Sequence, residues 1–111
     1  EYRRVSDCLV GGLSAAWLEQ LRIDVCFVAA SGLDREGLST TELSETLMKQ
    51  QILKRSKRRV LVADSEKWDA PAAVRFAGWG DVTDFVCDRE LSAAARSLVR
   101  SSGVKIHLGA P

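Results

Sequence analysis

Short apolar runs that alternate with helical segments are the feature that most constrains this sequence. Residues 24–30, 60–63, 84–87 and 104–108 each have the pattern of a brief strand, and the first two are apolar at almost every position. Strands that are apolar on both faces are typical of parallel sheets. Alternation of such strands with helices predicts an α/β fold, with a mostly parallel sheet, flanking helices and right-handed crossovers.

Three segments between or beside these runs have apolar residues at helical spacing. They cover residues 14–22, about 41–58, and 91–99, where the apolar side chains recur every three or four positions. Ser39, three residues before Glu42, has the capping-box pattern that starts a helix. The apolar stripe of the second helix is expected to contain Leu43, Leu47, Met48 and Ile52.

Two connections are expected to lack regular structure. Residues 33–41 are predicted to be a loop, in which Gly37 takes a backbone conformation that other residues avoid. Gly103 is predicted to cap the last helix at its C-terminus. A less regular stretch follows the second strand and contains Trp68, Pro71, Val74, Phe76 and Trp79.

Length and charge limit the kind of protein this can be. The chain has 111 residues, which suits one domain, and 46% of them are hydrophobic, which is enough for a packed core. The 16 basic and 15 acidic residues give a net charge of +1. That balance argues against the whole chain being a nucleic-acid binder. The basic run 54–59 is better explained as a solvated helix end, where cations favour the helix dipole, than as a contact to phosphates.

Targeting and redox features are sparse. No apolar run approaches the ~20 residues that span a bilayer, and the chain begins at Glu1 without a signal peptide, as expected for a piece of a longer protein. Cys8, Cys26 and Cys87 form no disulfide framework and no zinc-ligand spacing. We expect reduced core cysteines in a cytoplasmic protein, with no metal and no cofactor.

Polar residues gather where three predicted strands end, and in open α/β sheets ligands bind beyond those carboxyl ends. An ammonium group beside carboxylates and hydroxyls suits a phosphorylated or polyhydroxylated ligand. Taken singly, such residues are often turn caps or surface residues. If the strands are neighbours, one rim collects Ser31, Gly32 and Asp34 from the first, Asp64, Ser65 and Lys67 from the second, and Asp88 from the third.

Other candidate residues are less specific. Glu45 and Lys49 are four apart on the second helix, the spacing of an ordinary surface ion pair. His107 is the only histidine and has no obvious partner in the sequence. The chain has no glycine-rich phosphate loop and no metal-ligand motif.

The ordered set of these motifs resembles the C-terminal effector-sensing domain of DeoR-type bacterial transcriptional regulators. The similar segments extend over nearly the whole chain. They are Asp7 with Val10-Gly11, residues 21–27, 32–34 and 36–39, Glu45 with Lys49, and residues 61–68 and 82–88.

The resemblance implies a Rossmann-like fold of the sugar-phosphate isomerase and CoA-transferase type. Residues 1–111 would be the C-terminal part of one sensing domain that binds a phosphorylated sugar or similar effector. A helix-turn-helix upstream of Glu1 would bind DNA, and the regulator would be a homo-oligomer with no membrane contact. The implied effector-binding residues are Ser31, Gly32, Asp34, Glu45, Lys49, Asp64, Ser65 and Lys67, and none is catalytic.

Three features depart from the family pattern, and two other interpretations remain. Trp68 stands where relatives often have Phe, Glu66 where they often have a small residue, and the turn at residues 29–31 is less acidic than in some relatives. The chain is also similar to ribose-5-phosphate isomerase, whose reaction needs a base. Lys49 lies near the position of that base and favours holding an anion, although Glu45 could substitute, so we favour sensing over turnover. A third interpretation is an assembly module with residues 71–79 at an oligomer contact.

Overall fold

The computed structural model describes residues 22–109 of the chain. Cys8 and the helix predicted for residues 14–22, apart from Arg22, therefore lie outside the described residues. The elements are β1 (Ile23–Ala29), β2 (Gly32–Asp34), β3 (Gly37–Thr40), α3 (Leu43–Arg55), β4 (Ser56–Val62), η1 (Ser65–Lys67), β5 (Val74–Ala77), η2 (Trp79–Asp81), β6 (Asp84–Asp88), α4 (Ala93–Ser101) and β7 (Lys105–Gly109).

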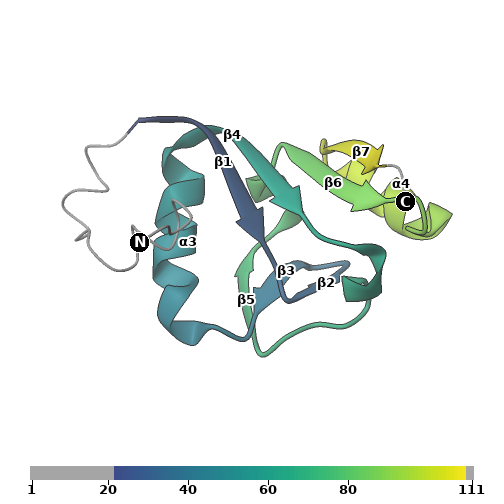
Figure 1. Cartoon of the computed structure of the whole chain (residues 1–111), viewed down its shortest axis with the longest axis horizontal. Helices are drawn as coiled ribbons and strands as arrows, with labels where there is room; N and C mark the ends of the chain where they lie inside the picture. The colour runs from purple at the N-terminus through teal and green to yellow at the C-terminus, as the bar shows by residue number, and fades with distance from the viewer. Residues whose placement is uncertain (1–21, 110–111) are drawn as a thin grey trace.

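The predicted parallel sheet is confirmed. Its four strands lie in the order β1-β4-β6-β7, and every neighbouring pair is parallel. In the register, Ala29 pairs with Val62, Val62 with Val86, and Val86 with His107. The strands therefore end together at one edge, and the arrowheads of β1, β4 and β6 mark that edge in Figure 1. The α/β class is as expected from the apolar runs.

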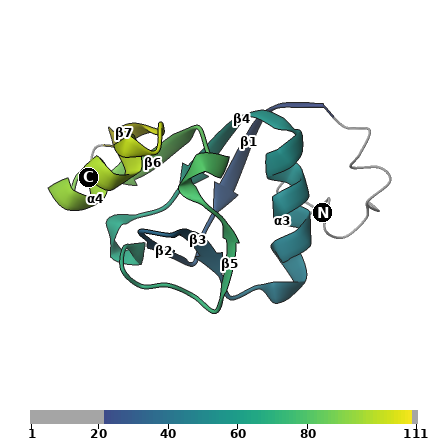
Figure 2. The same ribbon diagram turned by 180° about the vertical axis from the view of Figure 1, so that it is seen from behind.

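A second sheet replaces the predicted loop over residues 33–41. Strands β2, β3 and β5 form an antiparallel sheet in that order, and it lies between α3 at one end of the molecule and α4 at the other (Figures 1 and 2). Two of these strands are only three and four residues long, so alternation of polar and apolar positions could not reveal them. Their third partner, β5, comes from the stretch that was expected to be irregular.

The turn between β2 and β3 depends on Asp34 and Gly37. Asp34 Oδ1 accepts hydrogen bonds from the backbone N–H groups of Glu36 (2.9 Å) and Gly37 (3.1 Å). Gly37 has φ +145°, which confirms that the position needs glycine. A Cβ there would lie 2.1 Å from the carbonyl oxygen of Ala77, so β3 and β5 approach each other only because Gly37 has no side chain.

Helix α3 is shorter than predicted, and its cap differs. It ends at Arg55, and residues 56–59 belong to β4, where pairing with β1 overrides helix propensity. The capping box is wrong. Ser39 lies in β3, where its Oγ donates to the carbonyl of Gly32 (3.1 Å), while Thr40 Oγ1 accepts from the N–H of Glu42 (3.0 Å).

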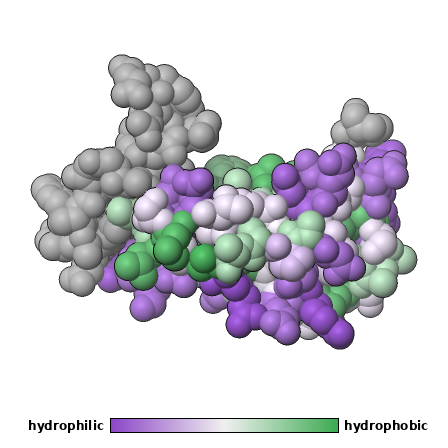
Figure 3. Space-filling model, turned by 90° about the horizontal axis from the view of Figure 1, so that it is seen from below, coloured by the Kyte–Doolittle hydropathy of each residue, from purple (hydrophilic) through white to green (hydrophobic). Residues whose placement is uncertain are grey.

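The predicted apolar stripe of α3 is only half correct. Ile52 is buried and Met48 packs against the core, but Leu43 and Leu47 are 68% and 75% exposed. Thr46 is buried on the inward side instead. Figure 3 shows apolar surface gathered next to hydrophilic surface on the half of the molecule that contains α3.

Helix α4 follows its prediction closely. Ser92 caps it, with its Oγ accepting from the N–H of Ala95 (3.1 Å). At the other end Gly103 has φ +88° and donates to the carbonyl of Arg100 (2.9 Å). Gly103 therefore takes the left-handed conformation expected of a glycine after a helix.

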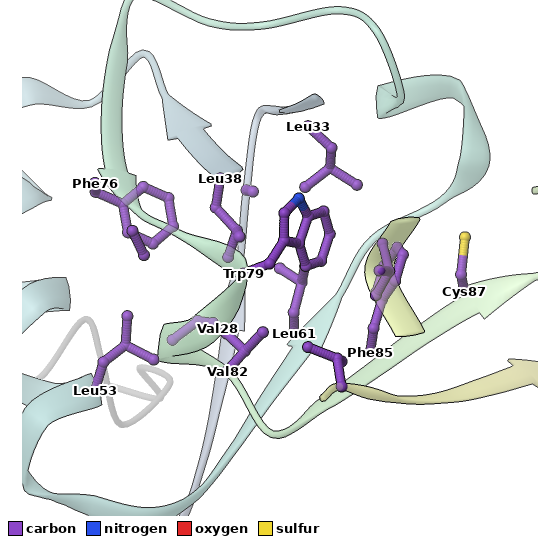
Figure 4. Packing of buried hydrophobic residues seen from close by; sticks show 14 of the residues in the cluster. Val28, Leu33, Leu38, Leu53, Leu61, Phe76, Trp79, Val82, Phe85 and Cys87 are labelled. Atoms are coloured by element: carbon purple, nitrogen blue, oxygen red, sulfur yellow. The ribbon is translucent and has the colours of Figure 1, made fainter. Parts of the chain in front are cut away.

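The core lies between the parallel sheet and the small sheet (Figure 4). Trp79 is its centre: the ring lies 5.3 Å from Phe85, and Nε1 donates to the carbonyl of Asp34 (2.8 Å). Trp79 and Phe76 are buried, so the prediction of an oligomer contact at these two side chains is wrong. Cys26 and Cys87 are buried free cysteines, as predicted. Within residues 22–109, no helix is both long and apolar enough to cross a membrane.

Candidate functional site

A cavity of about 490 Å³ lies where all four parallel strands end. Its floor consists of small and apolar residues, and its polar members stand at the ends of β4 and β6. The lining residues are Ala29, Ala30, Val62, Ala63, Asp64, Lys67, Val86, Cys87, Asp88 and Gly109. This is the edge at which ligands bind in open α/β sheets, and the prediction that Asp64, Lys67 and Asp88 converge there is confirmed.

The segment from Asp64 to Lys67 forms a single tight turn, η1. Asp64 caps it: Oδ1 accepts from the N–H of Glu66 (3.1 Å), and the backbone carbonyl accepts from the N–H of Lys67 (3.1 Å). The turn reverses the chain directly after β4, and this brings Lys67 to the rim. Lys67 is the one basic residue among those that line the cavity.

Asp88 connects β6 to this turn. Its Oδ2 accepts from the backbone N–H of Ser65 (2.9 Å), and its Oδ1 accepts from the N–H of Glu90 (2.8 Å). These hydrogen bonds, the one from Ser65 first, lower the pKa of Asp88, because they favour the ionised carboxylate. Sequence reasoning placed Asp88 on the rim but gave no sign of its bond to Ser65.

Cys87 lies beside Asp88 in the cavity lining. Burial raises the pKa of its thiol, and the negative charge of Asp88 adds to the effect. The thiol is therefore neutral near pH 7 and behaves as part of the apolar floor.

Three predicted site residues lie in or next to the small sheet and do not line the cavity. Ser31 Oγ accepts from the N–H of Thr41 (3.4 Å), Gly32 packs against the backbone of Ala70, and Asp34 closes the β2–β3 turn. The first strand contributes Ala29 and Ala30 to the cavity instead. The convergence on one rim is therefore wrong for these three residues, because the chain turns into β2 immediately after β1.

Neither Lys49 nor Glu45 lines the cavity, although Lys49 contacts one of its lining residues. Lys49 Nζ donates to the carbonyl of Ala29 (3.1 Å) and stands 4.9 Å from the centre of the Phe76 ring. Burial lowers the pKa of Lys49, although the charges of Glu45 and Glu42 partly oppose this. No ion pair joins Lys49 to Glu45 in the described part of the chain, so the surface-pair interpretation is not confirmed.

A charge cluster that the sequence pattern did not reveal lies at the opposite end of β6, around the buried Asp84. Asp84 accepts from Arg58 Nε (3.2 Å) and Nη2 (3.1 Å), from Thr83 Oγ1 (2.7 Å), and from His107 Nε2 (2.8 Å). Hydrogen bonds from Arg58, His107 and Thr83, in that order, hold the pKa of Asp84 well below its usual range. The cluster ties β4, β6 and β7 together, and it gives His107 the partner that the sequence did not reveal.

This cluster also changes the interpretation of the basic run. Arg58 and Arg59 lie in β4 and not at a helix end. Arg59 donates from Nε to the carbonyl of Asp81 (2.6 Å) and from Nη1 to that of Ser56 (3.0 Å). It lines a second cavity, of about 470 Å³, beside the end of α3. Because its guanidinium group is bonded to backbone carbonyls, that cavity is the weaker candidate for a ligand.

Comparison with known proteins gives a consistent result. The sequence pattern of a family described as the DeoR C terminal sensor domain matches residues 1–89. Over 105 residues, 94% of this chain, the sequence is 32% identical to the HTH-type transcriptional regulator GlpR of Haloferax volcanii. Over 83 residues, 74% of the chain, it is 34% identical to the uncharacterized HTH-type transcriptional regulator FruR of Bacillus subtilis. The aligned parts are 41% and 33% of those two proteins, so the chain spans about two fifths or less of their length.

Proposed function

The chain belongs to the family of DeoR C terminal sensor domains, and from this premise we propose that it senses a phosphorylated sugar or a related metabolite. Its cavity at the carboxyl ends of β1, β4, β6 and β7 would form one wall of the effector site. The relatives are transcriptional regulators. Effector binding would shift the intact protein between states with different affinity for DNA.

The composition of the cavity rim is the observation that carries this proposal. Lys67 supplies one positive charge, and the carboxylates of Asp64 and Asp88 line the same cavity. An ammonium group pairs with a phosphate as a compact point charge with three donors. A carboxylate can accept about four hydrogen bonds. Asp88 accepts two and Asp64 one from backbone N–H groups, so both keep acceptor sites for sugar hydroxyls. The rim therefore suits a ligand that carries both an anionic group and hydroxyls.

The proposed roles differ among the predicted residues. Asp64, Ser65 and Lys67 form the turn at the cavity and are proposed to face the effector. Lys49 is proposed to support the cavity wall through its hydrogen bond to Ala29. Effector binding stays a prediction for Ser31, Gly32, Asp34 and Glu45. The described contacts of the first three stabilise the small sheet, and Glu45 lies on α3.

We favour a non-catalytic sensor over an isomerase. Proton transfer between carbons requires a base within reach of the substrate. Glu45, the residue proposed as a substitute base, does not line the cavity, and the relatives are regulators.

Another part of the protein would contact DNA, and the intact protein would be a homo-oligomer. Coupling between effector and DNA sites is typically ~1–3 kcal/mol, or about 5–150-fold in affinity.

Replacing Lys67 tests the proposal. In the intact protein, Lys67→Ala is expected to abolish the effect of sugar phosphates on DNA binding, because it removes the cation of the cavity, while DNA affinity without effector stays unchanged. The measurement is a DNA-binding titration with and without pentose and hexose phosphates. Lys57→Ala is the matched control, since Lys57 is an exposed lysine of β4 outside the cavity. An unchanged response in Lys67→Ala would remove Lys67 from the effector site.

A further inference from the structure

The turn that carries Lys67 has a backbone hydrogen bond to another element on each side, and Trp68 beside it packs against Trp79 (5.9 Å between ring centres). At its start, the N–H of Ser65 donates to Asp88 Oδ2 (2.9 Å). Just after its end, the N–H of Asp69 donates to the carbonyl of Leu33 (2.8 Å). The hydrogen bonds between these attachments stay within the turn itself. The orientation of Lys67 therefore depends on these two backbone hydrogen bonds and on the packing of Trp68 against the core.

The anchor at Asp88 is the one of the two that depends on a side chain. A hydrogen bond to a charged carboxylate is roughly twice as strong as one between neutral groups. Asp88 is also the last residue of β6, which is paired on both sides, by β4 and by β7. The carboxylate is thus fixed by the centre of the parallel sheet, while Leu33 belongs to a short strand of the smaller sheet.

We propose that Asp88 is a positioning residue, which holds η1 so that Lys67 faces the cavity. Asp88 would act through the backbone of Ser65. Its two oxygens already accept from the N–H groups of Ser65 and Glu90, and this bridges the loop after β4 to the loop after β6. The effect on ligand affinity rests on the proposed function, whereas the effect on the turn does not.

Loss of this anchor has a calculable consequence for binding. The apparent affinity of a ligand falls in proportion to the fraction of molecules that are competent to bind. If the turn holds Lys67 toward the cavity in only about one tenth of the molecules, the apparent dissociation constant rises about tenfold. Asp88 is 21 positions from Lys67 in the sequence, so sequence proximity would not predict that its replacement lowers ligand affinity.

Three variants of the intact protein separate positioning from general stability. Asp88→Ala removes both hydrogen bonds, and Asp88→Asn keeps one acceptor oxygen of the same size and position. Ser92→Ala is the control, because it removes the cap of α4 in the same connection without touching η1. The first measurement, made without ligand, is hydrogen exchange at the Ser65 amide. The second is the affinity for ribose 5-phosphate and fructose 6-phosphate.

The expected results are graded. In Asp88→Ala the Ser65 amide exchanges at least about tenfold faster and the affinity for a bound probe falls about tenfold, with partial rescue in Asp88→Asn. Ser92→Ala leaves both quantities within about twofold, even where it lowers the melting temperature.

Three results would count against the proposal. Unchanged Ser65 exchange in Asp88→Ala overturns the positioning role. Faster exchange with unchanged probe affinity overturns its link to binding, and an equal loss in Ser92→Ala does the same. If the unmodified protein binds neither probe, the proposed effector class fails, and the exchange data alone decide whether Asp88 positions the turn.

Discussion

Glycine-to-alanine substitutions at three positions give a quantitative test of how the small sheet is packed. Gly37 has a φ of +145°, and a Cβ added there would lie 2.1 Å from the carbonyl oxygen of Ala77. Gly32 has no positive φ, but its Cβ would lie 2.1 Å from the carbonyl oxygen of Ala70. Gly80 has neither problem, since nothing lies within 4 Å of its Cβ position.

The expected loss of stability follows from these distances. Ordinary contacts of a Cβ begin at 3.4 Å, so a backbone segment must move about 1.3 Å at Gly32 or Gly37, and packed backbone does not yield cheaply. The unfavourable φ at Gly37 adds about 1–3 kcal/mol. We expect Gly37→Ala to lower the free energy of unfolding by about 4 kcal/mol and Gly32→Ala by about 2–3 kcal/mol. Gly80→Ala should lie between no change and a gain of about 1 kcal/mol.

Equilibrium urea denaturation of the three variants measures these differences. A loss of about 4 kcal/mol corresponds to a fall in melting temperature of more than about 15 °C for a domain of this size. The essential result is that the loss of unfolding free energy increases in the order Gly80, Gly32, Gly37, because all three substitutions add the same methyl group. If Gly37→Ala were as stable as Gly80→Ala, the close pairing of β3 with β5 would be refuted.

Two further substitutions test single contacts. Asp84→Asn should cost about 2 kcal/mol at pH 7, a moderate value because Arg58 and His107 are partly exposed and can be rehydrated. The pKa of Asp84 is lowered in the folded state, so the stability that its carboxylate contributes is complete above the unfolded carboxyl pKa of about 3.9 and is lost as the pH falls below that value. The difference in free energy of unfolding between the unmodified protein and Asp84→Asn should therefore be smaller at pH 3 than at pH 7, as measured by denaturation. Trp79→Phe should cost about 1–2 kcal/mol, because the carbonyl of Asp34 loses its donor; a neutral result in urea denaturation would argue against that bond.

The parallel sheet was predictable because local pattern and long-range pairing agree there. Val60 and Leu61 belong to a run that is apolar at every position, and both are buried in β4. Such a run has few stable solutions other than a central strand. The glycine at position 103 is a local signal of the same kind, which depends on a few neighbouring residues.

The small sheet was not predictable from pattern, because its stability comes from distant partners. Leu38 pairs with Leu33 across a turn and with Ala77 from a segment almost forty residues away. A strand of three or four residues has too few positions to show alternation. For the same reason Leu43 and Leu47 were wrongly assigned to the core: their spacing is helical, but the neighbours that cover α3 decide which side of the helix is buried.

The candidate site, too, was predictable only where local sequence decides the structure. The sequence alone determined that Asp64, Lys67 and Asp88 stand at strand ends, because a strand end is marked by a local change from apolar to polar residues. Only the tertiary structure decided that these three share one cavity, that Ser31 and Asp34 do not line it, and that His107 contacts Asp84. Those relations depend on strand order and register, which arise from the packing of the whole sheet and leave no mark in any short stretch of residues.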